Sequence, residues 1–517
     1  MPKLSPVDLA MFLLESETRP FNVGPLIVLR PPAGFRGNFA DHLLKKMLAR
    51  PVNPPFNCKL TLGFDRMPAI VPVSDVNPAD HVHRVTLNGR AGMRALFGKV
   101  CALHEVRLDR SRPLWELYVI DGLEDGRVAL YGRMHHGIID GRTFVRLFTH
   151  WMSSSPAERT VRAMWEGVPR TSPPGAVHAS LSSHIQGLLG GAKALGTTTS
   201  SLARLLVARS LATAGVTEGL KLPFVDVPAI LDGELSAKRS YAYCTLPLPE
   251  VKAFAKQHQA TVNDVLLTVL DIALDRYLHE QRTTPAKPIV IDMPIALSGA
   301  GGGNQITMLQ VPLGRPGATP GERLAAVHAN TALVKREMAG QTNDAAMLFG
   351  TLAHAFPSLV ERVGLGRRWK LANAVVSNPF GMTEPCYLMG AEVELALPMS
   401  LVPPGQTLNI TAVTLVDKLQ IGFLAVPDAV PHVERLAKYT EAAFPTLTGA
   451  FAKQKDVRER MSATGRPERE YRSAQREGSP MTAKPGRGPR RAGKVPSAEA
   501  APTATVNGRR RRAPATQ

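Results

Sequence analysis

The sequence has few cysteines, few aromatic residues and no long apolar run. Its four cysteines, Cys58, Cys101, Cys244 and Cys386, stand singly with no C-x-x-C pair, which excludes a disulfide scaffold and a cysteine-rich zinc site and fits a reducing cytosol. No stretch approaches the roughly 20 uninterrupted apolar residues that span a bilayer, and the N-terminal residues lack the pattern of a secretory signal. We therefore expect a cytoplasmic protein whose contact with a membrane, if it makes one, is peripheral.

The composition that remains is that of a soluble globular protein with a basic end. With 44% hydrophobic and 20% charged residues in 517, the chain can build the cores of two large domains. The net charge is +19, of which the last 65 residues carry +11. That tail is expected to be disordered. It is either simply solvated or contacts anionic lipid or nucleic acid through Arg509–Arg512, but no fold signature of a specific nucleic-acid reader accompanies it.

Changes in composition predict four segments. Residues 1–168 mix strand and helix patterns, and residues 233–450 do so again, which indicates an α/β or α+β fold in each. Residues 169–232 between them are rich in Pro, Gly, Ser, Thr and Ala and contain amphipathic helical patterns. These helices either pack on the two domains or present an interfacial face to lipid. Residues 451–517 form the tail.

Local patterns predict individual elements in both domains. Strands are expected at residues 23–29, 127–134, 240–246, 289–295, 307–313, 374–377, 408–415 and 419–424. Helices are expected at residues 94–104, 142–152, 261–278, 323–338 and 433–444. Thr261 and Asp264 form a capping box at the start of the 261–278 helix.

The segment that indicates chemistry is YGRMHHGIIDGRTF, residues 131–144. A predicted strand runs into His135 and His136, and Asp140 and Gly141 precede a helix. A histidine on a tight loop after a strand can take a proton from an incoming nucleophile and return it to a leaving group, because its ordinary pKa lies near 6.5. Asp140 can bond to the backbone, or to an arginine such as Arg133, and so hold the loop.

Two other interpretations of the histidine pair are a metal site and simple packing. Adjacent histidines on a strand point to opposite faces, and no third ligand follows at a helical spacing, so no metal is expected. A Ser-His-Asp hydrolase is disfavoured because the chain has no G-x-S-x-G elbow.

The motif HHGIIDG resembles the HHxxxDG signature of the CoA-dependent acyltransferase superfamily. Further segments resemble one branch of it, the bacterial wax ester synthase/diacylglycerol acyltransferase family, over about residues 4 to 447. In chain order they are LSPVDLAMFLLESETRPFNVGPLIVL, LDRSRPLWELYVIDGL, TVNDVLLTVLDIALDRYL, GNQITMLQVPL and LNITAVTLVDKLQIGFLAVPDAVP. Several motifs in one order are more specific than a single motif.

This resemblance implies two chloramphenicol-acetyltransferase-like domains with a substrate tunnel between them. It implies that His136 is the general base that deprotonates an acceptor hydroxyl, that Asp140 orients the loop, and that His135 and Gly141 support it. The substrates would be acyl-CoA and diacylglycerol or a long-chain alcohol, the products triacylglycerol or wax ester, and no cofactor would be needed. The enzyme would work at a membrane or lipid-inclusion surface.

Other residues are candidates for contacts with the substrate or the oxyanion. Asn304 follows a run of three glycines and is either an oxyanion contributor or part of a plain turn. Asn263 and Asp264 match a family motif, although the capping box alone accounts for Asp264. Phe144 stands where the family often has a small residue, and it could narrow the acceptor channel. The stretch SNPFGMTEP, from Ser377, departs from the usual SNVPGP of the family.

Two alternatives to this function stay open at the level of sequence. One is a condensation-type acyltransferase that uses a carrier-protein thioester with the same histidine base. The other is a non-catalytic lipid-surface protein. The sequence leaves the acceptor, the acyl-chain length, the oligomeric state, the role of the tail and the source of the oxyanion donors open.

Overall fold

The computed structural model describes residues 6–61, 69–139, 141–167, 192–234, 236–296, 306–362, 370–378 and 381–463. Residues 1–454 form one compact unit, and residues 455–517 form a second. Of the second unit, only the end of one long helix, as far as Ala463, is described. The predicted disordered tail otherwise lies outside the described residues.

The first sheet carries the histidine motif on an inner strand. Its six strands follow the order β11-β12-β1-β6-β5-β4. Their bounds are β1 Asn22–Arg30, β4 Val82–Ala91, β5 Trp115–Leu123, β6 Val128–His135, β11 Tyr387–Leu388 and β12 Ala391–Met399. All neighbours pair antiparallel except β4 and β5, which are parallel. A small separate sheet pairs β2 (Cys58–Thr61) with β3 (Ala69–Pro72).

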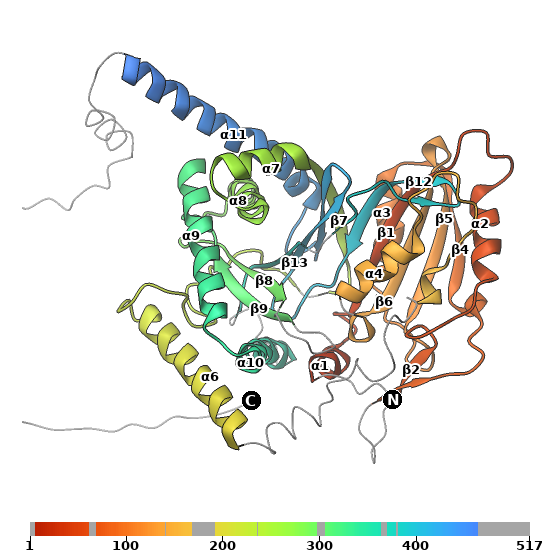
Figure 1. Ribbon diagram of the computed structural model, residues 1–517, viewed down its shortest axis with the longest axis horizontal. Helices are drawn as coiled ribbons and strands as arrows, with labels where there is room; N and C mark the ends of the chain where they lie inside the picture. Colours follow the sequence, from red (N-terminus) through yellow and green to blue (C-terminus); the bar gives the residue numbers. More distant parts are fainter. Residues whose placement is uncertain are drawn as a thin grey trace, which may run out of the picture. The chain divides into compact units, whose positions relative to one another are not determined.

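Two strands of this sheet come from the far end of the sequence. β12 pairs antiparallel with β1, so that Leu26 lies opposite Leu397, and β11 pairs with β12 at the edge. Figure 1 shows the cyan β12 beside the red β1. The predicted C-terminal domain therefore contributes strands to the sheet of the predicted N-terminal one, while the domain boundaries themselves stay a prediction.

The second sheet is mixed and has six strands. Its order is β7-β14-β13-β10-β8-β9. The bounds are β7 Ser240–Pro247, β8 Val290–Ala296, β9 Ile306–Pro312, β10 Ala374–Ser377, β13 Leu408–Leu415 and β14 Lys418–Ala425. β10 runs parallel to both of its neighbours, β8 and β13, and the other pairs are antiparallel.

Helices flank both sheets. Their bounds are α1 Pro6–Leu14, α2 Phe39–Leu48, α3 Met93–His104, α4 Gly141–Trp151, α6 Ala192–Thr213, α7 Leu248–Gln257, α8 Val262–Glu280, α9 Pro320–Ala339, α10 Asn343–Arg362 and α11 Val433–Ala463. Capping boxes begin α8 at Thr261 and α9 at Thr319, where the reciprocal bonds satisfy N–H groups that the helix itself cannot pair. α8 is apolar almost all round and is buried accordingly.

The packing of the core explains why the sequence of β1 is a nearly continuous apolar run. Leu26 and Val28 pack into the larger apolar cluster, which also covers the second sheet, whereas Ile27 and Leu29 pack into a cluster on the opposite face. Because successive side chains of a strand point to opposite faces, a strand covered on both sides has no solvent-facing position. The first sheet is therefore buried on both faces at β1.

The predicted mixed α/β class is confirmed, and the predicted elements lie where the patterns placed them, within a few residues. One end is wrong: the last helix was expected over residues 433–444 but runs from Val433 to Ala463. Helices α1, α2 and α10 and strands β4, β5 and β12 were not anticipated. Of the helical patterns in the 169–232 connection, the second forms part of α6, and the first lies outside the described residues.

Candidate active site

The histidine pair lies where β6 leaves the first sheet. β6 ends at His135, and a short 3-10 turn, η3 (His136–Ile138), follows it. The His135 N–H donates to the Leu114 carbonyl at 3.0 Å, and the His136 N–H donates to the Phe21 carbonyl at 2.9 Å. Neighbouring segments on both sides thus hold the backbone of the pair. The His136 side chain is half-buried.

His135 is enclosed and electrically neutral. Its ring stacks on Phe12 at 4.1 Å and more distantly on Phe21, and the side chain is 1% exposed. Its Nδ1 accepts a hydrogen bond from the Gly137 N–H at 3.0 Å, so the ring proton lies on Nε2. Burial, and next the nearby Arg110 charge, lower its pKa to about 3.

Glycine is required at the centre of this turn. A Cβ atom at Gly137 would lie 2.7 Å from a ring carbon of Phe12 and 3.1 Å from His135 Nδ1. Real Cβ atoms essentially never come as close as the first distance, and the second is tighter than most of their contacts. The close approach of Phe12 therefore depends on the absence of a side chain at this position, and with it the stacking on His135.

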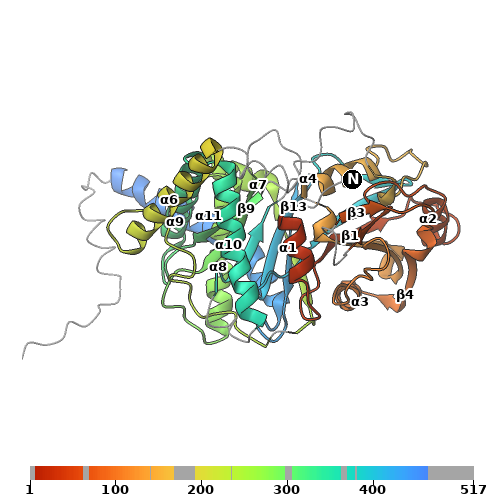
Figure 2. The ribbon, with the colours of Figure 1, turned by 90° about the horizontal axis from the view of Figure 1, so that it is seen from below.

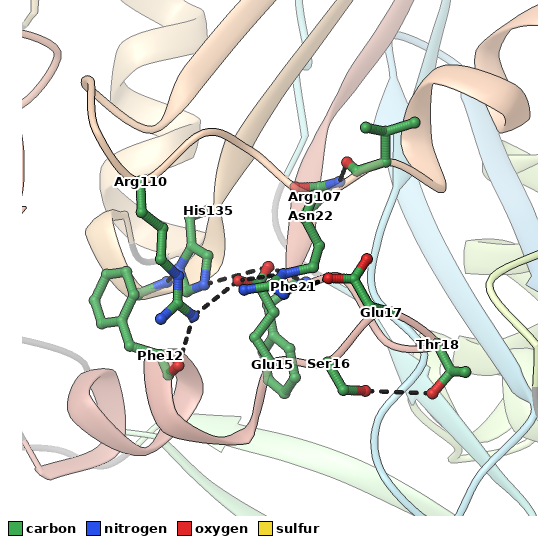
Figure 3. Close-up of polar contacts among 12 residues, drawn as sticks. Phe12, Glu15, Ser16, Glu17, Thr18, Phe21, Asn22, Arg107, Arg110 and His135 are labelled. Carbon is green, nitrogen blue, oxygen red and sulfur yellow. Dashed lines mark hydrogen bonds and ion pairs between the residues drawn. The ribbon is translucent and has the colours of Figure 1, made fainter.

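A buried carboxylate, Glu15, stands behind His135 (Figure 3). Its side chain is 1% exposed, and Oε1 lies 3.8 Å from His135 Nε2 and accepts from the Phe21 N–H at 3.2 Å. Oε2 pairs with Arg110 Nη2 at 2.9 Å and with Arg107 Nε at 3.3 Å. Two guanidinium groups thus balance the charge of the carboxylate, which lies too far from His135 Nε2 for a hydrogen bond.

Sequence reasoning did not single out Glu15. Its signal is weak: one acidic residue directly after the apolar run of α1. Its role becomes visible only in three dimensions, because both arginines that hold it come from the loop between α3 and β5, more than 90 residues away.

Arg133, which the sequence suggested as a partner for Asp140, donates to a carboxylate and two carbonyls among the described residues. Its Nε and Nη2 donate to Glu116 Oε2 at 2.9 and 2.6 Å. Nη1 donates to the carbonyls of Leu103 and Val106. All three guanidinium nitrogens are therefore occupied. Asp140 itself lies outside the described residues, so its orienting role stays a prediction.

Of the other candidates, Asp264 has a structural environment. It is fully buried and accepts bonds from Thr261 N at 2.9 Å, Thr331 Oγ1 at 2.6 Å and His328 Nδ1 at 3.0 Å. Burial acts to raise the pKa of Asp264, but these bonds outweigh it and hold the pKa below its usual range. Asn263, beside it on α8, contacts the Met293 sulfur at 3.5 Å.

The remaining candidates lie in different places. Phe144, in the first turns of α4, packs against the apolar cluster of the first sheet, and Gly141 begins that helix. Ser377, at the end of β10, shares a hydrogen bond with Thr411 at 2.9 Å. Asn304 lies outside the described residues. Among the described residues, no group of three His, Cys, Asp or Glu side chains is arranged to hold a metal ion.

Comparison with known proteins decides the family. The model of the wax ester synthase/diacylglycerol acyltransferase catalytic domain matches residues 4–266, and that of the family's C-terminal domain matches residues 302–448. The chain belongs to the wax ester synthase/diacylglycerol acyltransferase family. The match includes the turn that carries His135 and His136.

Relatives and solved structures agree with this assignment. The chain is 33% identical to the probable diacylglycerol O-acyltransferase Tgs4 of Mycobacterium tuberculosis over 86% of its own length and 96% of that protein. It superposes on the wax ester synthase/diacylglycerol acyltransferase of Marinobacter aquaeolei VT8 with a TM-score of 0.65 at 25% identity, covering 86% and 98% of the chains. The first condensation domain of the calcium-dependent antibiotic synthetase shares the fold, with a TM-score of 0.52 at 14% identity, covering 86% and 95%.

Within this family fold the two adjacent histidines have different surroundings. His135 is stacked, neutral and enclosed, so it cannot exchange protons near neutral pH. His136 begins the turn that leaves the sheet and is half-buried. The turn therefore offers one imidazole as a positioning group and the next as the candidate for proton transfer.

Proposed function

We propose that this chain transfers a fatty acyl group from acyl-CoA to the hydroxyl of diacylglycerol, of a long-chain alcohol, or of both. His136 is the general base in this proposal. It takes the hydroxyl proton as the oxygen attacks the thioester carbonyl, and it returns the proton to the CoA thiolate as the tetrahedral intermediate collapses. The products are an ester and free CoA, and the reaction proposed here uses no cofactor.

The observation that carries the proposal is the environment of His135. A buried ring whose pKa is lowered to about 3 stays neutral at working pH. It therefore orients the turn and leaves proton transfer to His136. Asp140 as the group that holds the loop, and Asn304 as an oxyanion donor, belong to the same proposal, because the negative charge of the intermediate needs fixed donors.

The substrates also imply a place of work. Acyl chains and diacylglycerol reside in membranes and lipid inclusions, and no described helix is long and apolar enough to cross a bilayer. We therefore propose peripheral contact with a lipid surface. The positive charge of the C-terminal 65 residues supports attraction to anionic headgroups.

The test compares wild type with His136→Ala. Purified proteins are incubated with palmitoyl-CoA and either hexadecanol or dioleoylglycerol, and CoA release and ester are both measured. Loss of a general base predicts a rate about 10² to 10⁴ times lower. The matched control is His279→Ala, at an exposed histidine in the last turn of α8, which should retain the wild-type rate.

Either of two results would overturn the proposal. The first is an unchanged rate in His136→Ala. The second is no ester from either acceptor with wild type; ester formation that then needs an acyl carrier protein would indicate the condensation-type alternative. If wild type is active, the preferred acceptor distinguishes triacylglycerol synthesis from wax ester synthesis.

A further inference from the structure

Large apolar side chains that stay exposed gather on three helices of the first compact unit. Nine are exposed among the described residues, and seven of them lie on α1, α6 and α10. They are Leu13 on α1, Leu206, Val207 and Leu211 on α6, and Leu348, Leu352 and Phe356 on α10. α10 contacts both other helices, and Figure 2 shows the three on one side. We call these seven residues the apolar face.

Contacts on the inner side of α10 fix which residues point outward. His354 Nε2 lies 2.6 Å from Asp292 Oδ2 of β8, and the Ala346 carbonyl accepts from Thr307 Oγ1 of β9 at 2.9 Å. Phe349 is buried beside them. Turning the helix to bury Leu348 and Leu352 would break these bonds.

α6 is held in the same way by a buried arginine. The Arg209 side chain is 1% exposed, its Nη2 pairs with Glu337 Oε1 at 2.5 Å, and its guanidinium lies 4.7 Å from the Phe349 ring centre. Ser201 Oγ donates to Gln341 Oε1 at 2.7 Å. These contacts fix the side of α6 that faces the protein. Leu206 and Val207 therefore point toward solvent.

A helix that faces water looks different in this same chain. Over its first three turns α11 exposes Glu434, Arg435, Lys438 and Glu441. Over a similar length, Leu348–Phe356, the exposed residues of α10 carry no charge, and the only charged exposed residue among those described on α6 is Arg204. Water-facing helix surfaces are normally charged or polar, and contiguous exposed apolar surface marks a binding site. Asp344, in the first turn of α10, is exposed and acidic. The exposed charges described on α6 and α10 therefore balance, and what distinguishes this surface is its apolar side chains.

The apolar face is continuous with the candidate active site. α1 packs against η3, Phe12 of α1 stacks on His135, and the next residue, Leu13, is 58% exposed. One helix thus joins the exposed surface to the turn that carries His136.

We propose that the apolar face docks on the surface of a phospholipid bilayer. Its apolar side chains enter the boundary between headgroups and acyl chains, and Arg204 meets the headgroups. Lipid substrates then reach the turn beside α1 without crossing water. This inference rests on the proposed function, because the apolar substrates of that function are the reason to expect a bilayer as the partner.

The experiment measures co-sedimentation of the full chain with vesicles of phosphatidylethanolamine and phosphatidylglycerol. It is run at about 1 M salt, where the Debye length falls to roughly 3 Å, so that the basic tail is screened. The partition coefficient of the variant Leu348→Glu/Leu352→Glu between vesicles and solution should be lower than that of wild type by a factor of about ten or more. The matched control Ala442→Glu/Thr446→Glu places the same charges, four residues apart, on exposed positions of α11 and should bind as wild type.

Failure of the docking proposal and failure of the proposed function are separable. Detergent-dispersed substrates test ester formation without vesicles, and there the α10 variant should keep the wild-type rate. Vesicle binding without ester formation would overturn the function and leave the docking. Equal vesicle binding by wild type and the α10 variant, or no binding by an active wild type, would overturn the docking.

A second copy of this chain is the competing occupant. If wild type is a dimer in the absence of lipid and the α10 variant is a monomer, the apolar face mediates self-association. That result would overturn the bilayer proposal. Circular dichroism checks that each variant folds. If the α10 variant does not fold, Leu206→Glu/Val207→Glu on α6 provides the same comparison.

Discussion

Two histidines of this chain face buried carboxylates, and their pKa values shift in opposite directions. His135, in the first sheet, has Glu15 Oε1 at 3.8 Å from Nε2, and its pKa is lowered to about 3. His354, on α10 over the second sheet, has Asp292 Oδ2 at 2.6 Å from Nε2, and its pKa is raised. Burial acts to lower the pKa of both rings, so burial alone does not account for the difference.

The difference lies in what else each carboxylate binds. Glu15 is paired with two guanidinium groups, so little of its charge is left to attract a proton to His135. Among the described residues, the other donors to Asp292 are neutral side-chain amides, from Gln310 at 3.0 Å and Gln406 at 3.2 Å. The second ring nitrogen, Nδ1 of His354, faces the Gly350 carbonyl at 2.7 Å, which accepts and cannot donate.

The comparison shows that proximity to a carboxylate does not by itself charge a histidine. The carboxylate must still have charge to offer, and the ring must have acceptors at both nitrogens. His354 satisfies both conditions, and its contact with Asp292 ties α10 to the sheet. His135 satisfies neither, and its ring stays neutral.

The largest effect on this comparison is expected from Asp292→Ala. The change removes the carboxylate that contacts His354, and breaking such a pair by removing one partner destabilises a protein by about 3 kcal/mol or more. Urea denaturation at pH 6 measures the free energy of unfolding. The double variant Asp292→Leu/His354→Leu should recover much of the loss, because it removes both charges. A loss below about 1 kcal/mol in the single variant would show that the pair is not ionised.

A smaller effect is expected from His135→Gln, in the pH dependence of stability. The folded pKa of about 3 lies below the ordinary value near 6.5, so wild type loses stability as pH falls from about 6.5 toward 3. This loss is on the order of 3 kcal/mol at pH 4. The variant should show a flatter urea-denaturation profile in that window.

The matched control for this experiment is His354→Gln. The folded pKa of His354 is raised, so its contribution is complete below about 6.5 and is lost as pH rises through the folded pKa. This variant should flatten the profile above pH 6.5 instead. Two variants that flatten the same window would contradict the assignment of opposite pKa shifts.

The smallest effect is expected from Arg110→Met. Removing one of the two cations leaves Glu15 with uncompensated charge, so the pKa of His135 should rise from about 3. It should remain below 6.5, since burial, the larger cause, is unchanged. An NMR titration of the imidazole measures it. Arg112→Met, at an exposed arginine paired with Asp109, should leave the His135 pKa unchanged, and the same result for Arg110→Met would refute our account.

Local patterns in the sequence predicted much of the fold and little of its long-range pairing. The periodicity of α8 and the capping box at Thr261 are local signals, and the structure confirms both. The pairing of β12 with β1 joins residues about 370 apart. Nothing in residues 391–399 alone indicates which edge they will join, because the choice depends on which sheet is left incomplete elsewhere.

The candidate site was likewise predicted in part from local sequence patterns. The motif identified His135 and His136, and the structure places both at the end of β6. The motif did not indicate which surroundings would make His135 neutral, since Glu15, Arg107 and Arg110 are distant in sequence. The roles of Asp140 and Asn304 stay predictions.

The insertion of β12 into the first sheet has a consequence for synthesis of the chain. β1 leaves the ribosome early, but its partner strand is complete only at Met399. At about 5 to 20 residues per second, the apolar edge of β1 waits roughly 20 to 80 s for its neighbour. Such an edge is a template for pairing with other chains. Nascent chains of this protein therefore present an open strand edge until Met399 has been synthesised, and we expect a chaperone that covers this edge to reduce their aggregation.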